Sequence, residues 1–248
     1  MKKLANKIAL VTGGSRGIGA AIVSRLAGDG ASVAFTYTSD ASAEKAANIV
    51  TGIQNAGGRA IAIKANSRFA DEVINAVNST VAEFGGLDIL VNNAGILTIK
   101  DISELTIADY DELMDVNVKA VFVAASEAVK HLKSGGRIIS IGSNMGDNAI
   151  MPKTTLYTMS KSALQGFTRA LSRDLGPKGI TVTLVQPGPT NTDMNPEDTD
   201  LAEYFRTRMA LGKYGTPEDV AALVAFLASE ESANITGSFI TTDAGFNA

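Results

Sequence analysis

The amino-acid sequence predicts a doubly wound α/β fold, in which a single parallel sheet of about seven strands carries helices on both faces. Short apolar runs, rich in β-branched residues, alternate with longer helical stretches along all 248 residues. The runs are apolar throughout rather than at every second position, which is typical of strands buried on both sides. No repeat and no linker-like change in composition divides the chain, so we expect one domain over residues 1–248.

The first strand and helix show the pattern clearly. Residues 7–12 form a continuous apolar run, and a glycine-rich loop leads from it into a helical stretch at residues 17–28. Ile18, Ile22 and Leu26 recur at helical spacing in this stretch, which predicts one buried face. The next elements are a strand at 32–37, a helix at 41–56 ended by Gly57-Gly58, a strand at 59–64, a helix at 71–84 ended by Gly85-Gly86, and a strand at 87–91.

The second half continues the alternation with longer helices. Residues 108–133 are helical, as two pieces or as one bent helix, and a glycine pair then introduces a strand at 137–141. A polar, proline-bearing segment at residues 186–199 interrupts the rhythm. The remaining elements are a helix at 157–176 ended by Gly176-Pro177, a strand at 180–185, helices at 200–209 and 217–228, and a short strand at 238–242.

The composition excludes several kinds of catalytic centre. The chain has no cysteine, which rules out disulfides, thiolate zinc sites, iron–sulfur clusters and a cysteine nucleophile. Its single histidine, His131, cannot form a multi-histidine metal site, and its neighbours indicate an exposed helix end. We therefore expect no metal. Glycine is abundant at 24 residues without any low-complexity tract, which indicates that individual glycines have positional roles.

Charge and hydropathy narrow the range of partners. The net charge of −4 argues against a nucleic-acid partner, because binding a phosphate backbone requires a basic face. The longest apolar stretch, residues 220–228, is about half a membrane span, and the apolar run at residues 8–11 is too short for a signal peptide. We expect a cytoplasmic protein with no membrane partner.

The glycine-rich loop at residues 12–19, Thr-Gly-Gly-Ser-Arg-Gly-Ile-Gly, joins the first strand to the first helix. Glycines there allow a sharp turn and let backbone N–H groups approach a phosphate, while the helix N-terminus adds donors and partial positive charge. The spacing differs from the G-x-G-x-x-G fingerprint, and glycine also occurs in such turns for geometry alone. The first βα turn of a doubly wound sheet is, however, where dinucleotides bind, which favours a nucleotide site.

Tyr157 and Lys161 lie four residues apart on an expected helix and so share one face. A surface tyrosine packed on a lysine stem is the simple structural explanation. The chemical alternative is a general acid–base pair, because a nearby cation favours the phenolate and lowers a pKa that is ordinarily near 10. Ser143 follows the strand at 137–141, whose carboxyl end opens onto the same crevice as the glycine loop. Its hydroxyl is suited either to hold a substrate oxygen or to stabilise a turn.

Together these residues resemble the short-chain dehydrogenase/reductase family. The resemblance covers essentially the whole chain, and its pieces are specific in combination rather than singly. It implies a Rossmann fold and an oxidoreductase, similar to bacterial 3-oxoacyl-[acyl-carrier-protein] reductases and related carbonyl reductases. The matching pieces are, in order, the loop at residues 12–19, Asn92-Asn93-Ala94-Gly95, Asn117, Ser143, Tyr157, Lys161 and Pro187-Gly188.

The resemblance implies a role for each catalytic residue. Tyr157 protonates the carbonyl oxygen as a hydride arrives from a nicotinamide, and Lys161 lowers the tyrosine pKa and holds the nicotinamide ribose. Ser143 orients the carbonyl, and Asn117 holds a water that feeds a proton relay through Lys161. The chemistry agrees with this set, because hydride transfer to a ketone builds negative charge on oxygen and needs a positioned donor rather than a thiol or a metal.

The resemblance also implies the cofactor contacts. NADP(H) is favoured over NAD(H), because the strand at 32–37 reaches no acidic residue before Asp40 and Arg16 places a cation in the glycine loop. NAD(H) is the alternative if Asp40 turns back onto the ribose, and Asn66 has a helix cap as its structural alternative. The implied contacts are Gly13, Ser15, Arg16, Gly17, Ile18, Gly19, Tyr37, Thr38, Asn66, Ser67, Asn93, Ala94, Gly95, Tyr157, Lys161, Pro187, Gly188 and Thr190.

The expected substrate is a small-molecule ketone or secondary alcohol of unassigned structure. The interval from Ser143 to Tyr157 is one residue longer than in 3-oxoacyl-[acyl-carrier-protein] reductases of fatty acid synthesis, which are the alternative. An alternative of another class is a non-catalytic nucleotide or ligand sensor on the same fold. Residues 186–210 are expected to form a lid-like segment over the cofactor. Candidates to shape the substrate pocket are Asn144, Met145, Met151, Thr190, Met194 and Tyr204.

Family members are commonly homotetramers, and we expect a homotetramer here. The apolar stripe on the helix at 157–176 would serve such an interface or pack against the sheet, and the sequence leaves both open. Its members are Ala163, Leu164, Phe167 and Leu171.

Overall fold

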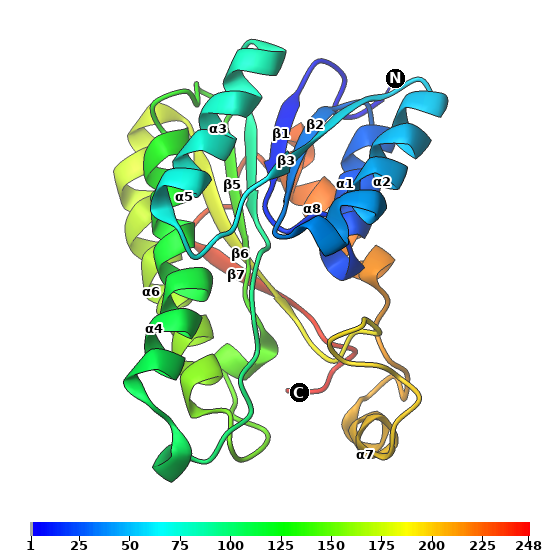
Figure 1. Cartoon of the computed structure of the whole chain (residues 1–248), viewed down its shortest axis with the longest axis vertical. Coiled ribbons are helices and arrows are strands. Elements are labelled where there is room, and N and C mark those ends of the chain that lie inside the picture. The colour runs from blue at the N-terminus through cyan, green and yellow to red at the C-terminus, as the bar shows by residue number, and fades with distance from the viewer. Residues whose placement is uncertain (1) are drawn as a thin grey trace.

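A parallel sheet runs through the middle of the molecule, with helices on either side of it (Figure 1). The structure, a computed structural model, describes residues 2–248. The strand order is β3-β2-β1-β4-β5-β6-β7, and each strand is parallel to its neighbours. The strands are β1 (Ile8–Val11), β2 (Ser32–Tyr37), β3 (Arg59–Lys64), β4 (Ile89–Asn92), β5 (Arg137–Ile141), β6 (Thr181–Pro187) and β7 (Ser238–Thr242).

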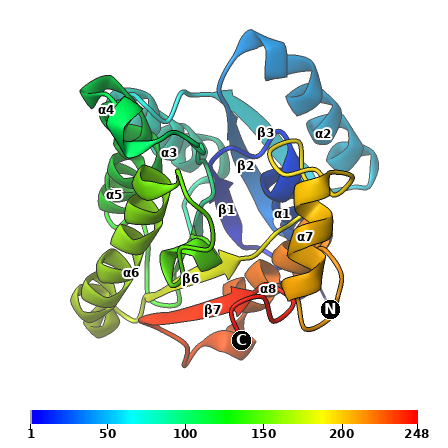
Figure 2. The same ribbon diagram turned by 90° about the horizontal axis from the view of Figure 1, so that it is seen from below.

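The helices divide between the two faces of the sheet. Both views show α3, α5 and α6 on one side of the strands and α1, α2 and α8 on the other (Figures 1 and 2). The helices are α1 (Gly17–Gly28), α2 (Ala43–Asn55), α3 (Ala70–Phe84), α4 (Ile107–Met114), α5 (Ala120–Ala128), α6 (Thr155–Leu175), α7 (Asp200–Arg208) and α8 (Pro217–Ala228). This arrangement confirms the doubly wound α/β fold predicted from the sequence.

Two apolar cores explain why the strands are apolar on both faces. One core packs Phe35 of β2 and Ile22 of α1 with Val224 of α8, and the other packs Leu10 of β1 with Ala124 of α5. Side chains of successive strand residues point to opposite faces, so a strand covered on both faces needs apolar residues at consecutive positions.

Some element boundaries differ from the prediction. The helical stretch at 108–133 is a continuous run of α4, a π-helical turn (Asp115–Lys119) and α5, and it ends at Ala128. The prediction that His131 is exposed was wrong in detail, because its side chain is only 27% exposed and its ring nitrogen Nε2 lies 3.2 Å from Asn78 Oδ1 of α3. In the stripe on α6, Leu164 is 2% exposed and packs against the sheet residue Leu184, whereas Ala163, Phe167 and Leu171 are only partly buried.

The chain order creates a crevice at one end of the sheet. From β1 the chain moves outward through β2 to β3, and then returns to β4 on the other side of β1. The loops that follow β1 and β4 therefore leave in opposite directions, and ligands of open α/β sheets bind in the gap between such loops. Within residues 2–248, no helix is long and apolar enough to cross a membrane.

Candidate active site

A cavity of about 710 Å³ lies at the carboxyl ends of the strands. The loops that follow β1 to β6 all contribute to its wall, together with α6 and α7. Every residue that the family resemblance assigns to the cofactor lines this cavity, as does Ser143. Asn117 is the one predicted catalytic residue outside the wall. The fold thus gathers residues from Gly13 to Thr190 around one space.

The glycine loop forms a narrow backbone cradle at the start of α1. Gly13 has a φ of +67°, which side chains other than glycine rarely adopt. A Cβ atom at Gly19 would lie 2.2 Å from the carbonyl oxygen of Gly13 and 2.5 Å from Nδ2 of Asn93. The loop can therefore close only without a side chain at position 19. Its backbone and the N-terminus of α1 face the cavity, as an anion site requires.

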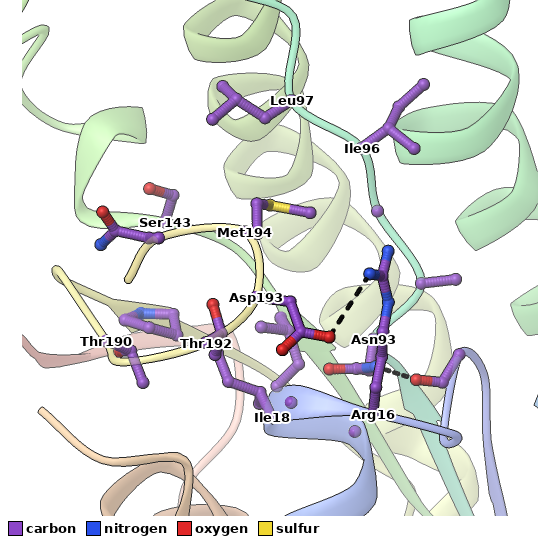
Figure 3. A pocket seen from close by; sticks show the side chains of 18 of the residues that line it. Arg16, Ile18, Asn93, Ile96, Leu97, Ser143, Thr190, Thr192, Asp193 and Met194 are labelled. Carbon is purple, nitrogen blue, oxygen red and sulfur yellow. Dashed lines mark hydrogen bonds and ion pairs between the residues drawn. The ribbon is translucent and has the colours of Figure 1, made fainter. Parts of the chain in front are cut away.

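Hydrogen bonds hold this cradle against the loop that follows β4. The Thr36 hydroxyl accepts the Gly13 N–H at 2.9 Å, and the Thr12 hydroxyl accepts the N–H groups of Asn93 and Ala94, each at 3.0 Å. The Asn93 amide donates to the carbonyl oxygens of Thr12 at 2.9 Å and Gly13 at 3.0 Å; Figure 3 shows it beside the glycine loop. The Asn93 side chain therefore shapes the loop as well as lining the cavity.

Tyr157, Ser143 and Lys161 meet at the other end of the cavity. Tyr157 lies in the first turn of α6, which begins at Thr155, two residues earlier than predicted. Lys161 follows one turn later. The Lys161 ammonium lies 5.6 Å from the centre of the Tyr157 ring and donates to the carbonyl oxygen of Ile141 at 2.9 Å. The Ser143 hydroxyl accepts the N–H of Met145 at 3.1 Å, which fixes its position after β5.

The electrostatics of this pair differ from the expectation. Burial raises the pKa of the Tyr157 phenol, while a hydrogen bond with Ser143 opposes part of the rise. Burial also lowers the pKa of Lys161 to about 8. The expectation was a Tyr157 pKa lowered by Lys161, whereas the net shift is upward, because desolvation of the buried phenol is its largest cause. The phenol keeps its proton at neutral pH.

Asn117 lies in the π-helical turn and is 1% exposed. Its Oδ1 accepts the N–H of Ile96 at 2.9 Å, and its Nδ2 donates to the carbonyl oxygen of Ile96 at 2.9 Å and to the Ser160 hydroxyl at 3.1 Å. Ser160 in turn donates to the backbone carbonyl of Tyr157 at 2.7 Å. Asn117 thus connects the loop after β4 to the first turn of α6, and its side chain is occupied by these protein contacts.

The end of the cavity that Arg16 and Lys45 line, which we call the adenosine end, shows whether Asp40 can reach a bound ribose. Asp40 is absent from the cavity wall and accepts a hydrogen bond from Lys64 at 2.7 Å, which raises the pKa of Lys64. The Asp40 carboxylate, which follows β2, therefore does not turn back into the cavity. Asn66 lines the cavity, and its Oδ1 accepts the N–H of Arg68 at 3.0 Å in a turn just before α3. It is not the cap of that helix, because the N-cap of α3 is Phe69.

The cavity is cationic although the chain as a whole is acidic. The charged residues of its wall are Arg16, Lys45, Arg68, Glu112, Lys161 and Asp193. These are four cations and two carboxylates, in a protein whose net charge is −4. A phosphate-bearing ligand fits this donor set and the backbone cradle.

The cavity wall also includes apolar residues that the sequence did not single out. Five of the six proposed pocket residues line the cavity: Asn144, Met145, Met151, Thr190 and Met194. Tyr204 does not, since it is 52% exposed and its neighbour Phe205 faces inward instead. The apolar residues that sequence reasoning missed are Ile96, Leu97, Ile99, Ile150, Leu201 and Phe205. Helical or loop position alone gives no signal for such residues.

Comparison with known proteins decides the family. The family model described as enoyl-(acyl carrier protein) reductase matches residues 13–247. The chain belongs to the short-chain dehydrogenase/reductase family. A short-chain dehydrogenase from Burkholderia cenocepacia J2315, in complex with NADP, is 53% identical with a TM-score of 0.97, over 99% of this chain and 100% of that one.

Two further proteins that are similar to this chain bear on the cofactor and on the activity. A blue fluorescent protein from a metagenomic library, in complex with NADPH, is 47% identical with a TM-score of 0.98, over 99% of this chain and 100% of that chain. The cyclic-di-GMP-binding biofilm dispersal mediator protein of Escherichia coli K12 is 43% identical over the full length of both chains. Similar chains are therefore named both for a nicotinamide cofactor and for a second nucleotide.

Proposed function

We propose that the protein is an NADP(H)-dependent oxidoreductase that interconverts a ketone and a secondary alcohol, with Tyr157 as the general acid and base. One observation carries the proposal: the Tyr157 phenol, the Ser143 hydroxyl and the Lys161 ammonium share a cavity with a glycine cradle suited to a pyrophosphate. NADPH, when bound, supplies the hydride.

The residues divide the remaining work. The Ser143 hydroxyl holds the substrate carbonyl oxygen, and the Tyr157 phenol gives that oxygen a proton as negative charge develops on it. The raised pKa of Tyr157 suits reduction, because the phenol carries the proton it must donate. Lys161 holds the ribose and returns a proton to Tyr157. Asn117 positions the first turn of α6 through Ser160, so that the phenol meets the carbonyl.

NADP(H) is the preferred cofactor in this proposal. Arg16 and Lys45 line the adenosine end of the cavity, while Asp40 is paired with Lys64. A 2′-phosphate gains from the two cations, and the Asp40 carboxylate does not face it. The NADP and NADPH complexes of similar proteins support the same choice.

The apolar residues of the cavity wall favour an uncharged, hydrophobic ketone. Ile96, Met151 and Phe205 lie in this wall, and a hydrocarbon substrate surface gains by leaving water for such surroundings. The alternative is a 3-oxoacyl-[acyl-carrier-protein] substrate. The matching family model is also described as an acyl-carrier-protein reductase, although one that acts on enoyl groups. Both classes of substrate should be assayed for turnover.

The test is turnover by wild-type protein and by Tyr157→Phe. We expect loss of NADPH absorbance with hydrophobic ketones, and a fall of at least about a thousandfold in kcat for Tyr157→Phe, since the proton donor is lost. The dissociation constant of NADPH, measured from the change in its fluorescence, should stay within about twofold. Tyr204→Phe is the matched control, because this phenol lies outside the cavity. Turnover at the wild-type rate by Tyr157→Phe would refute the mechanism.

A nucleotide sensor without turnover is the second candidate. The name of the 43% identical Escherichia coli protein favours it, and so does a cationic cavity that accepts nucleotide phosphates. Titration with cyclic di-GMP, with and without saturating NADPH, separates the two functions. Absence of turnover with every ketone and thioester, together with tight binding of cyclic di-GMP, would establish the sensor.

Two further features complete the proposal: a single domain over residues 1–248 with a lid at residues 186–210, and assembly as a homotetramer. A backbone hydrogen bond holds the start of the lid segment, because the N–H of Gly215 donates to the carbonyl oxygen of Pro189 at 3.1 Å. α7 lies within it and contributes Leu201 and Phe205 to the cavity wall. Limited proteolysis with and without NADPH tests the lid, which should be cut more slowly when the cofactor is bound.

A further inference from the structure

A tight turn at residues 192–195 brings a carboxylate over the adenosine end of the cavity. Thr192 and Asn195 exchange backbone hydrogen bonds of 3.3 and 3.0 Å, which leaves Asp193 and Met194 at the tip. The turn is anchored from behind, since the N–H of Asn191 donates to the carbonyl oxygen of Gly215 at 2.9 Å and the Tyr214 hydroxyl donates to Asn195 Oδ1 at 3.3 Å. Asp193 is therefore carried by a defined turn.

The Asp193 carboxylate points at the glycine loop, toward the guanidinium of Arg16 (Figure 3). Its Oδ2 lies 3.7 Å from Nη1 of Arg16 and 3.9 Å from Nζ of Lys45. A single oxygen atom thus faces two cations that come from different elements, the N-terminal cap of α1 and the first turn of α2. An anion placed between these cations satisfies both.

We propose that Asp193 is a specificity-determining residue, an internal anion that occupies the Arg16–Lys45 cation pair until the 2′-phosphate of NADP(H) replaces it. Lys45 is then the second cation of the 2′-phosphate site, beside Arg16. This inference rests on the proposed NADP(H) binding.

The charges explain how the exchange works. The phosphate and the carboxylate are both anions, so they repel each other and compete for the same two cations. NADH carries a hydroxyl in place of the phosphate, so it leaves the Asp193 pairs in place. NADPH must break these pairs, which releases the turn at residues 192–195 from the glycine loop. Asp193 therefore lowers the preference for NADPH that Arg16 and Lys45 create.

All three side chains are more than half exposed, so the competition is modest and sensitive to salt. Exposed ion pairs contribute no more than about 1 kcal/mol, which corresponds to about a fivefold change in a dissociation constant. Higher ionic strength should reduce the effect of Asp193, because screening weakens all of these contacts.

The test is the dissociation constant of each nucleotide, measured by fluorescence titration without substrate. Asp193→Asn should bind NADPH about threefold to fivefold more tightly than wild type and bind NADH within about 1.5-fold of wild type. Lys45→Ala and Arg16→Ala should each weaken NADPH more than NADH. In the Arg16→Ala/Lys45→Ala background, Asp193→Asn should have little further effect, because the competed cations are gone.

Asp198→Asn is the matched control, since it removes the same charge from the same segment at a residue without an ion pair to Arg16 or Lys45. Unchanged or weaker NADPH binding by Asp193→Asn would overturn the inference, as would an equal gain in Asp198→Asn. Failure of wild-type protein to bind either nucleotide would instead refute the proposed function. The two failures are therefore distinguishable.

Discussion

At the scale of single residues, burial sets the protonation states in the candidate active site. Lys161 is 5% exposed and has lost most of its water, which lowers its pKa to about 8, and the same effect raises the pKa of Tyr157. The two pKa values therefore move apart, and the Lys161 ammonium becomes the more acidic of the two groups. Transfer of a proton from Lys161 to an ionised Tyr157 is consequently favourable, which suits Lys161 to return the proton that the phenol donates.

Lys161→Met should stabilise the protein without cofactor at pH 7. The folded state holds the Lys161 proton more weakly than the unfolded state, in which the pKa of the group is near 10.5. The buried charge therefore lowers the free energy of unfolding, and this effect is complete below about pH 8. We expect a gain of about 1–3 kcal/mol, after allowance for the lost hydrogen bond to Ile141. Wild-type stability recovers relative to the variant as pH rises from about 8 to 10.5. Urea unfolding of both proteins at pH 7 and pH 10 measures the difference, and an equal difference at the two pH values would contradict this account.

At the scale of elements, the glycine loop and the start of α1 act as one rigid part. Its shape depends on Thr12, Thr36 and Asn93, which come from the ends of three neighbouring strands. The cradle is consequently built by the register of the sheet rather than by the loop sequence alone.

Gly19→Ala should abolish nucleotide binding, because its methyl group would meet the Gly13 carbonyl and the Asn93 amide. We expect the NADPH dissociation constant to rise by at least about a hundredfold and the free energy of unfolding to fall by about 1–3 kcal/mol. Gly28→Ala, at the other end of α1, is the control, since a Cβ there meets no atom within 4 Å. It should bind NADPH like wild type and be slightly more stable. Similar binding by the two variants would show that the cradle is not required.

The sequence predicted most elements because strand burial and helix ends leave local signals. The apolar runs fixed the strands, and glycine after α3, which adopts a left-handed conformation at Gly85, marked a helix end. The start of α6 was missed by two residues, because Thr154 makes no side-chain cap to mark it. The π-helical turn was also missed, since it depends on the contacts of Asn117 with Ile96 and Ser160.

The candidate site was predictable where residues stand at strand ends, as Gly13, Asn93 and Ser143 do. The residues that were missed act through partners far away in the sequence. Asp193 meets Arg16 and Lys45 across the cavity, and Ser160 joins Asn117 to Tyr157. No local pattern encodes such pairs, which arise only when the strands and helices come together. The direction of the Tyr157 pKa shift was missed for the same reason, since it depends on burial in the folded protein.

At the scale of the whole molecule, charge and apolar surface are distributed unevenly. The cationic cavity contrasts with the acidic chain and directs phosphate-bearing ligands to one end of the sheet. Large apolar side chains are exposed on α4, α5 and α6, where Tyr110 is 41% exposed, Phe122 59% and Met159 41%. Such a surface fits the subunit interface of the proposed homotetramer.

Phe122→Glu should weaken this assembly, because a buried carboxylate at an apolar interface is costly. We expect wild-type protein to elute as a tetramer in size-exclusion chromatography with light scattering, and the variant as a smaller species. Phe69→Glu is the control, since Phe69 is 49% exposed but lies at the start of α3. A wild-type monomer, or a variant of unchanged mass, would refute the proposed interface.

The turn at residues 192–195 also makes the protein convenient for spectroscopy. Met194 at its tip is 48% exposed, and the chain has no cysteine. Met194→Cys would therefore carry the one thiol of the molecule, and a dye or spin label attached there would report on the approach of the turn to the glycine loop. No other residue would have to be removed first. Movements of this segment could then be followed in real time as each nucleotide is added.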